Sequence, residues 1–172
     1  MATIERRFPM SLDRANRAIT LAVLFVCGAV LGLQVVLCRP PVQWIPILTA
    51  ILLLPTLAVC WALAPTGIAV DGSALCIERR GWRALEIPLG EIAALESAPA
   101  VRPLGTVRLF GVGGFFGTFG LMWSRSLGRF RAYATQNAPS LLVRRRGALP
   151  LLVTPDDPQA LMAALRQVGV AA

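Results

Sequence analysis

The stretch from Ala18 to Ala64, AITLAVLFVCGAVLGLQVVLCRPPVQWIPILTAILLLPTLAVCWALA, decides how this chain is built. Its only charged residue is Arg39, which divides it into two apolar segments, Ala18–Cys38 and Val42–Ala64. A membrane-spanning helix needs about 20 mostly apolar residues. The two prolines that follow the arginine cannot continue a helix with normal hydrogen bonding, so they suit a turn. The sequence therefore predicts a transmembrane helical hairpin over residues 18–64.

Positive charge is placed unevenly around this hairpin. Only Arg39 lies in the connecting turn, whereas the outer flanks carry Arg6, Arg7, Arg14, Arg17, Arg79, Arg80 and Arg83. Arginine near the ends of a span favours the cytoplasm. We therefore expect a multi-pass protein of the inner membrane with both termini cytoplasmic, in which residues 1–17 and a soluble domain over residues 66–172 flank the hairpin. The first apolar core is too long for a signal peptide, so we expect it to remain in the mature protein.

Gly28 and Gly32 form a GxxxG pair in the first span. Small residues at this spacing let helix backbones approach closely in lipid. The pair predicts helix packing, either between the two spans of one hairpin or between copies in a homo-oligomer.

The composition argues against several classes of function. The net charge is +8, but every basic residue is arginine and no nucleic-acid recognition motif accompanies the charge, so no nucleic-acid partner is expected. The chain has no histidine and its four cysteines lack metal-ligand spacing. No nucleophile lies beside a base in the sequence. We expect no catalytic, cofactor-binding or metal-binding residues, and hence a protein that is not an enzyme and carries no cofactor.

After residue 65 the apolar pattern changes from long runs to short ones. Asp71–Gly72 between two β-prone runs is a strong turn signal. Predicted strands cover Thr66–Val70, Ala74–Arg79, Ala84–Pro88, Ile92–Ser97, Thr106–Phe110, Phe130–Thr135, Leu141–Arg145 and Ala148–Thr154. The segment TPDDP then supplies capping residues for a final helix with one apolar stripe. The fold class expected is a helical hairpin followed by a mainly β barrel that one C-terminal helix covers.

Two segments carry a family resemblance: RLFGVGGFFGTFGLMWSRSLGRFRAYAT (Arg108–Thr135) and TPDDPQALMAAL (Thr154–Leu165). With the strand pair between them, they resemble the bacterial pleckstrin-homology (PH)-like domain of small membrane proteins, over about Thr66–Val168. The resemblance implies a seven-stranded barrel capped by a helix and attached to membrane helices. It implies little about activity. The basic strand-loop-strand motif through which eukaryotic PH domains bind phosphoinositides has no residue-by-residue match here.

The glycine-rich segment from Gly111 to Gly120 admits three interpretations. A dinucleotide fingerprint is disfavoured, because neither a helix nor an acidic residue follows at the required place. In the second, the segment contacts the membrane or docks onto the hairpin. Its candidate contact residues are Phe115, Phe116, Phe119, Trp123, Arg125, Arg129 and Arg131. In the third, glycines permit sharp bends while the aromatic side chains fill the barrel core.

We therefore expect a membrane-anchored PH-like binding or scaffold module on the cytoplasmic face. Its partners would be the lipid bilayer, its anionic headgroups, or a protein. The alternative is a small accessory or regulatory subunit whose hairpin packs against a larger membrane protein complex.

Overall fold

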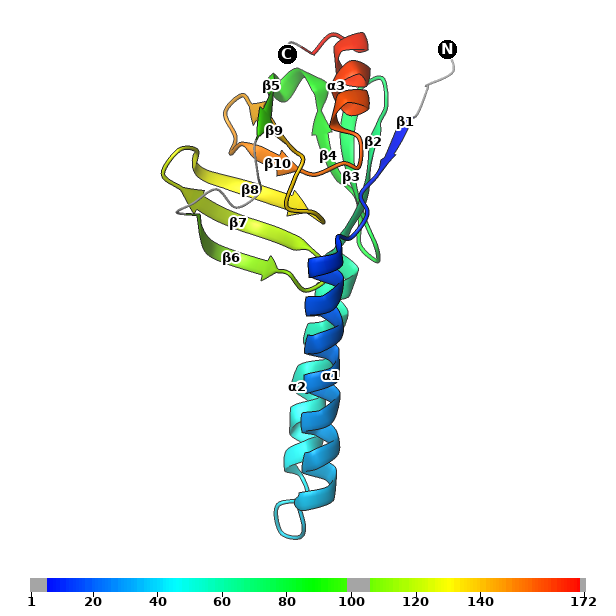
Figure 1. The fold of residues 1–172 in the computed structure, drawn as a ribbon, viewed down its shortest axis with the longest axis vertical. Helices are drawn as coiled ribbons and strands as arrows, with labels where there is room; N and C mark the ends of the chain where they lie inside the picture. Colours follow the sequence, from blue (N-terminus) through cyan, green and yellow to red (C-terminus); the bar gives the residue numbers. More distant parts are fainter. Residues whose placement is uncertain (1–5, 99–105, 171–172) are drawn as a thin grey trace.

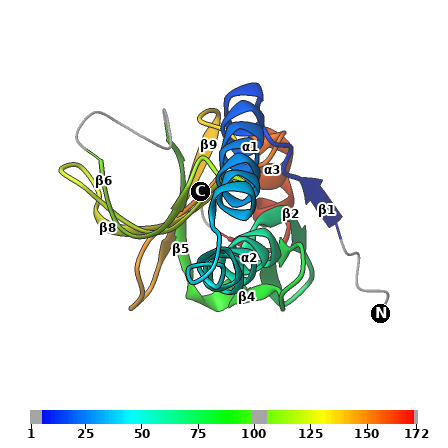
Figure 2. The same ribbon diagram turned by 90° about the horizontal axis from the view of Figure 1, so that it is seen from below.

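A computed structural model describes residues 6–98 and 106–170 of the chain. Two long helices run side by side away from a β-rich domain, and a short C-terminal helix lies at the far end of that domain (Figure 1). Figure 2, which looks along the two helices, shows β6 and β8 displaced to one side of them. The expectation of two apolar helices followed by a mainly β domain with one C-terminal helix is confirmed.

Helices α1 (Arg14–Leu37) and α2 (Ile45–Leu63) form the hairpin. Both are long and apolar enough to cross a membrane, and almost none of their surface is buried within the chain. Helix α1 begins four residues before the predicted span, because Asp13 caps it by accepting a hydrogen bond from the Asn16 N–H at 2.7 Å. Residues 14–17, which carry two arginines and precede the apolar core, are therefore part of the helix.

Ten strands among the described residues form two sheets. The first sheet has the order β1-β2-β3-β4 and the second the order β5-β9-β10-β8-β7-β6. Their bounds are β1 Arg6–Pro9, β2 Pro65–Val70, β3 Ala74–Arg79, β4 Leu85–Pro88, β5 Ile92–Ala98, β6 Val107–Gly113, β7 Thr118–Ser124, β8 Gly128–Ala134, β9 Ser140–Arg145 and β10 Leu151–Val153. A 3₁₀ turn, η1 (Leu89–Glu91), connects the two sheets.

One hydrophobic core lies between the sheets and α3 (Pro158–Gln167). The first sheet contributes the fully buried Ile68, Leu75 and Ile77, and α3 contributes Leu161 and Leu165. Strands β9 and β10 are buried on both faces, because their alternate leucines belong to a second cluster on the outer side. Burial on both faces explains their unbroken apolar sequences.

The strand prediction needs three corrections. The barrel implied by the resemblance has seven strands, whereas the region of the resemblance contains nine, from β2 to β10. Two strands have no counterpart in the prediction: β7, which begins inside the glycine-rich segment, and β1, which lies before the first span. The last predicted strand is shorter than expected, because residues 146–150 form the connection between β9 and β10.

The segment before α1 is tied to the β domain. Strand β1 pairs with β2 in antiparallel register, from Arg6 opposite Val70 to Pro9 opposite Gly67. Beyond β1, Ser11 donates two hydrogen bonds to the Asp156 carboxylate, at 2.8 Å from its N–H and 2.6 Å from its hydroxyl. The chain therefore enters the first apolar helix from a fixed position.

Asp156 and Asp157, the two acids expected to cap the start of α3, have different roles in the structure. Asp157 caps α3, because its carboxylate accepts a hydrogen bond from the Ala160 N–H at 2.9 Å. Asp156 instead bonds Ser11 and Gln136. One acid therefore begins the helix, and the other fastens the segment that leads into the hairpin.

Candidate functional site

Strand β6 forms the free edge of the six-stranded sheet and exposes apolar side chains. Phe110 is 80% exposed, Val107 54% and Leu109 50%. In Figure 1, β6 is the lowest strand of this sheet, on the side from which the helices extend. An exposed apolar row of this kind is a mark of an interaction surface.

On the face formed by β6, β7 and β8, the side chains change from apolar on the edge strand β6 to basic on β8. Val107 lies opposite Trp123, which lies opposite Arg129. One step closer to the helices, Phe110 lies opposite Leu121, which lies opposite Arg131. Side chains of directly opposed residues share one face of a sheet. Each of these two rows therefore begins with an apolar side chain at the edge strand and ends with an arginine two strands away.

Two glycines face each other across β6 and β7 at positions where no side chain fits. Gly111 lies opposite Gly120, and both have positive φ angles, of 126° and 133°. A Cβ on Gly111 would overlap the carbonyl oxygen of Phe119, and a Cβ on Gly120 would overlap that of Phe110. Only glycine fits at either position. The pair lets β6 bend, and a register irregularity between Arg108 and Phe110 lies just before it.

The turn between β6 and β7 docks onto the first part of α1. The Phe116 N–H donates to the Thr20 hydroxyl at 2.9 Å. Beside this contact, the Asn16 side-chain amide donates to the carbonyl of Thr135, which directly follows β8, at 2.8 Å. Gly114 leaves space for Ile19, whose Cδ1 would lie 3.1 Å from an added Cβ. The turn is thus fixed against the hairpin, as the interpretation that docks the segment onto the hairpin anticipates.

A second turn, between β3 and β4, is fastened to the end of α2. The Arg80 and Gly81 N–H groups donate to the carbonyls of Ala64 and Ala62, each at 3.0 Å. The Arg80 guanidinium lies 5.8 Å from the ring centroid of Trp61. The next side chain, Trp82, is exposed, so this turn presents an indole beside the hairpin.

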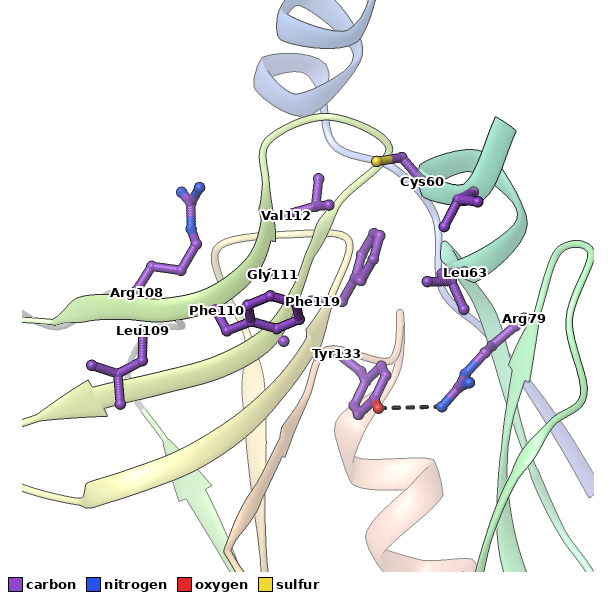
Figure 3. Close-up of a pocket in the computed structure, with 12 residues that line it drawn as sticks. Cys60, Leu63, Arg79, Arg108, Leu109, Phe110, Gly111, Val112, Phe119 and Tyr133 are labelled. Carbon is purple, nitrogen blue, oxygen red and sulfur yellow. Dashed lines mark hydrogen bonds between the residues drawn. The ribbon is translucent and has the colours of Figure 1, made fainter. Parts of the chain in front are cut away.

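A cavity of about 610 Å³ lies between the end of α2 and the face of β6–β8. Helix α2 contributes Val59, Cys60 and Leu63 to its lining. The rest comes from Arg79 on β3, Arg108, Leu109, Phe110, Gly111 and Val112 on β6, Phe119 and Gly120 on β7, and Tyr133 on β8. The cavity is mainly apolar, with two arginines and one phenol as its polar groups (Figure 3).

The polar groups of the cavity are all suited to an anion. No carboxylate is among the described residues that line it. Arg79 donates to the Tyr133 hydroxyl at 3.2 Å, and its guanidinium lies 5.5 Å from the Tyr133 ring centroid. The Arg79 Nε is buried and has no hydrogen-bond partner in the described part of the chain. A buried donor without an acceptor is costly unless a ligand supplies one.

Some of the residues predicted as contacts are buried in the structure, and others are exposed. Phe115 and Phe119 are only 8% and 6% exposed, so the expectation that they contact a membrane or partner is wrong for these two. Phe116 is half-buried against α1 and lies 5.9 Å from the Arg80 guanidinium. Trp123, Arg125, Arg129 and Arg131 are exposed.

Sequence reasoning missed the exposed side chains of β6 and the cavity behind them. Leu109 and Phe110 lie in the predicted strand Thr106–Phe110, but neither is singled out there as a contact residue. The alternation of apolar residues in this stretch was the available signal. It was obscured because glycines interrupt both β6 and β7.

The Gly28–Gly32 pair is not at the contact between the two helices. A Cβ added to either glycine would meet no atom within 4 Å. Packing between the two spans through this pair is therefore not found, and the face that carries it is open in the single chain.

Metal chemistry has no obvious location in the described residues. Across 6–98 and 106–170, no three side chains of the types His, Cys, Asp and Glu converge on one point. Glu96 lies beside Arg144, and the hydrogen bond from that guanidinium lowers the pKa of the carboxyl. This pair joins β5 to β9 on the exposed surface, far along the sheet from β6.

Comparison with known proteins agrees with the fold. A family model described as a bacterial PH domain matches residues 66–169, which is more than half of the chain. No curated protein and no solved structure matches the chain. The matched region runs from β2 to just beyond α3 and so includes every strand that lines the cavity. The chain therefore belongs to the bacterial PH domain family.

Proposed function

We propose that this protein is a membrane-anchored PH-like binding module of the inner membrane, and that its β6–β8 face engages anionic lipid headgroups. Helices α1 and α2 cross the bilayer as a hairpin, with both chain termini in the cytoplasm. The placement of arginine supports this orientation, because the turn between the helices carries one arginine and the other ends carry several. The module acts by binding and not by catalysis.

The order of side chains across β6, β7 and β8 carries the proposal. Adjacent strands lie about 4.7–4.9 Å apart, so the arginines on β8 stand about 10 Å from the apolar row on β6. An element at a bilayer surface buries apolar side chains at the headgroup boundary and keeps basic groups near the phosphates. Strand β6 is the lowest strand of its sheet, on the side from which the helices extend (Figure 1), and this position supports a contact of its apolar row with the bilayer.

The β3–β4 turn provides a second contact with the same bilayer surface. Trp82 lies between Arg80 and Arg83 in a turn that hydrogen-bonds to the last residues of α2. Tryptophan is enriched at the membrane–water boundary, where its ring is partly apolar and its N–H finds a polar partner. Two contacts on different sides of the hairpin would hold the domain in one orientation.

A fluorescent label on β6 tests the proposal in the full-length chain. The four native cysteines are replaced by serine, Val107→Cys is labelled with an environment-sensitive dye, and the protein is placed in nanodiscs of phosphatidylcholine with or without phosphatidylglycerol. We expect a blue-shifted emission that increases with anionic lipid and decreases with added salt, because exposed charges are screened.

Leu149→Cys is the matched control, since Leu149 is an exposed apolar residue in the connection between β9 and β10. The emission of the dye at position 149 should be that of a water-exposed dye, whatever the lipid composition of the nanodisc. Equal emission from positions 107 and 149, whatever the lipid charge, would refute the contact with headgroups.

The open face at Gly28 and Gly32 favours a second candidate function, that of an accessory subunit. Small residues exposed to lipid at GxxxG spacing permit close packing with another membrane helix. Purification in mild detergent should then retain a partner in fixed ratio, or a second copy of this chain. Gly28→Leu should release it, whereas Ala29→Leu should not. Recovery of a single chain in every case argues against this candidate.

A further inference from the structure

The cavity beside α2 shares Leu109 and Phe110 with the exposed face of β6–β8, but it is enclosed further by residues of α2 and β3. Its volume of about 610 Å³ lies within the range of about 300–1,000 Å³ that is usual for small-molecule sites. It is enclosed partly by Val59, Cys60 and Leu63 in the last turns of α2. These residues belong to the apolar helix itself, so the cavity opens at the level where a bilayer leaflet meets the domain.

Two arginines belong to the lining of the cavity, but only Arg79 is directed at its other polar group. In Figure 3, the Arg79 guanidinium points toward the Tyr133 hydroxyl, whereas Arg108 extends from β6 away from Tyr133 and Arg79. The Arg108 guanidinium lies against Gly113, where a side chain on that residue would overlap it. Arginine is the side chain best suited to phosphate recognition, because its planar fork donates several hydrogen bonds.

The walls of the cavity suit an apolar chain. Leu63, Val112 and Phe119 line the interior, and the sulfur of Cys60 points into it (Figure 3). A molecule that fits both the walls and the rim therefore has an anionic head and an apolar tail. The absence of any carboxylate among the described lining residues removes the repulsion that such a head would otherwise meet.

We infer that this cavity binds one anionic phospholipid from the adjacent leaflet, with its phosphate at the Arg79 guanidinium and the start of one acyl chain against α2. The inference rests on the proposed function, because the hairpin must place the cavity at the bilayer surface. It goes further in assigning one lipid molecule to one chain, in a site separate from Arg129 and Arg131. The free Nε of Arg79 would gain the acceptor that it lacks.

Native mass spectrometry of the full-length protein tests the inference. The protein is equilibrated with equal amounts of phosphatidylglycerol and phosphatidylcholine of the same acyl chains, and then transferred to detergent. We expect one phosphatidylglycerol to remain on each chain. Arg79→Gln should reduce its retention about tenfold, the loss expected for a charge-assisted hydrogen bond of about 1.5 kcal/mol.

Two further variants separate the cavity from the surface. Cys60→Phe fills the cavity and should abolish retention, whereas Cys27→Phe makes the same change in α1, away from the lining, and should preserve it. Arg125→Gln, an exposed arginine outside the cavity, should also preserve it. An excess of inorganic phosphate should fail to displace the lipid, since phosphate cannot occupy the apolar walls.

Retention of both lipids to the same extent, or equal retention by Cys60→Phe and Cys27→Phe, would overturn the inference. The dye at position 107 keeps this result distinct from the proposed function. In the Cys60→Phe variant, with the other three cysteines replaced by serine, that dye should still respond to anionic lipid even when no phospholipid is retained. If the dye at position 107 does not respond to anionic lipid in the protein without Cys60→Phe, that result would instead contradict the proposed contact of β6 with lipid headgroups.

Discussion

The backbone N–H of Phe116, in the turn between β6 and β7, donates a hydrogen bond of 2.9 Å to the hydroxyl of Thr20 on α1. The same hydroxyl donates to the Asn16 carbonyl at 2.7 Å, so it connects the turn to the helix backbone. Phe116 has a φ of 55°, which an L-residue adopts only when its surroundings hold it there. This contact fixes the β domain relative to the hairpin.

Thr20→Val should loosen that connection without changing the shape of the side chain much. The Phe116 N–H would lose its acceptor at a partly buried position, which costs about 1–3 kcal/mol. Hydrogen exchange at residues 114–117 should become faster in the full-length protein. Thr56→Val is the control, because the Thr56 hydroxyl likewise donates to the carbonyl four residues earlier, that of Leu52, but within α2. Similar exchange in both variants would show that Thr20 does not hold the turn.

Gly120→Ala should destabilise the β domain strongly. The new methyl group would overlap the Phe110 carbonyl and lie about 2.7 Å from the Gly111 Cα. Strain from the positive φ alone costs about 1–3 kcal/mol, and the overlap adds to it. Thermal unfolding in detergent measures the loss. Gly90→Ala, at a position where an added Cβ meets nothing within 4 Å, should change the melting temperature little. Equal effects of the two changes would contradict the close approach of β6 and β7.

Arg129→Gln combined with Arg131→Gln should weaken the response of the β6 dye to anionic lipid. Each arginine near a charged bilayer contributes about 1 kcal/mol, so the pair contributes about 2 kcal/mol at low salt. The titration with phosphatidylglycerol should shift to higher anionic content. Arg146→Gln with Arg166→Gln removes the same charge from exposed positions on other elements and should leave the titration unchanged. A shift of equal size in both double variants would mean that only net charge matters.

The Asp71 turn predicts a pH dependence of stability. Hydrogen bonds from the N–H groups of Ser73 and Ala74, and from the Ser73 hydroxyl, lower the pKa of the Asp71 carboxyl. A lowered pKa stabilises the fold above the pKa of the unfolded chain, and this stabilisation is lost as the pH falls through the folded value. The melting temperature of Asp71→Ala should therefore lie below that of the natural protein near neutral pH. The difference should shrink in strong acid; a constant difference would exclude the charge as its source.

The elements that the sequence predicted well are those whose signal is local. Two apolar runs of helical length predicted α1 and α2, and Asp71–Gly72 predicted the β2–β3 turn. Strand β7 was missed because Gly117 and Gly120 weaken the strand signal. Both positions need glycine for a tertiary reason: a side chain at Gly120 would overlap the backbone of β6, and one at Gly117 would overlap that of β8. Strand β1 was missed because four residues gain their strand geometry from β2, which follows only after the whole hairpin.

The site could be predicted only in part for the same reason. Arg129, Arg131 and Trp123 were identified from composition, and the register of β7 with β8 places Arg129 directly opposite Trp123. Phe119 was misjudged because it shares a face of β7 with the exposed Trp123, and it is buried only because its end of the strand packs into the core with Tyr133, a contact that no local pattern reveals. The cavity was beyond prediction, since its lining comes from α2, β3, β6, β7 and β8.

The most direct test of the account measures the depth of β6 and β8 relative to the bilayer. Nitroxide labels are attached in the cysteine-free chain through Phe110→Cys and, separately, Arg131→Cys, and their collision rates with oxygen and with a water-soluble nickel chelate are compared in anionic nanodiscs. The account predicts that the label on β6 is in the headgroup–acyl boundary, with oxygen favoured, while the label on β8 lies farther out by about 10 Å, two strand spacings. Two labels that are equally accessible to the nickel chelate would contradict it.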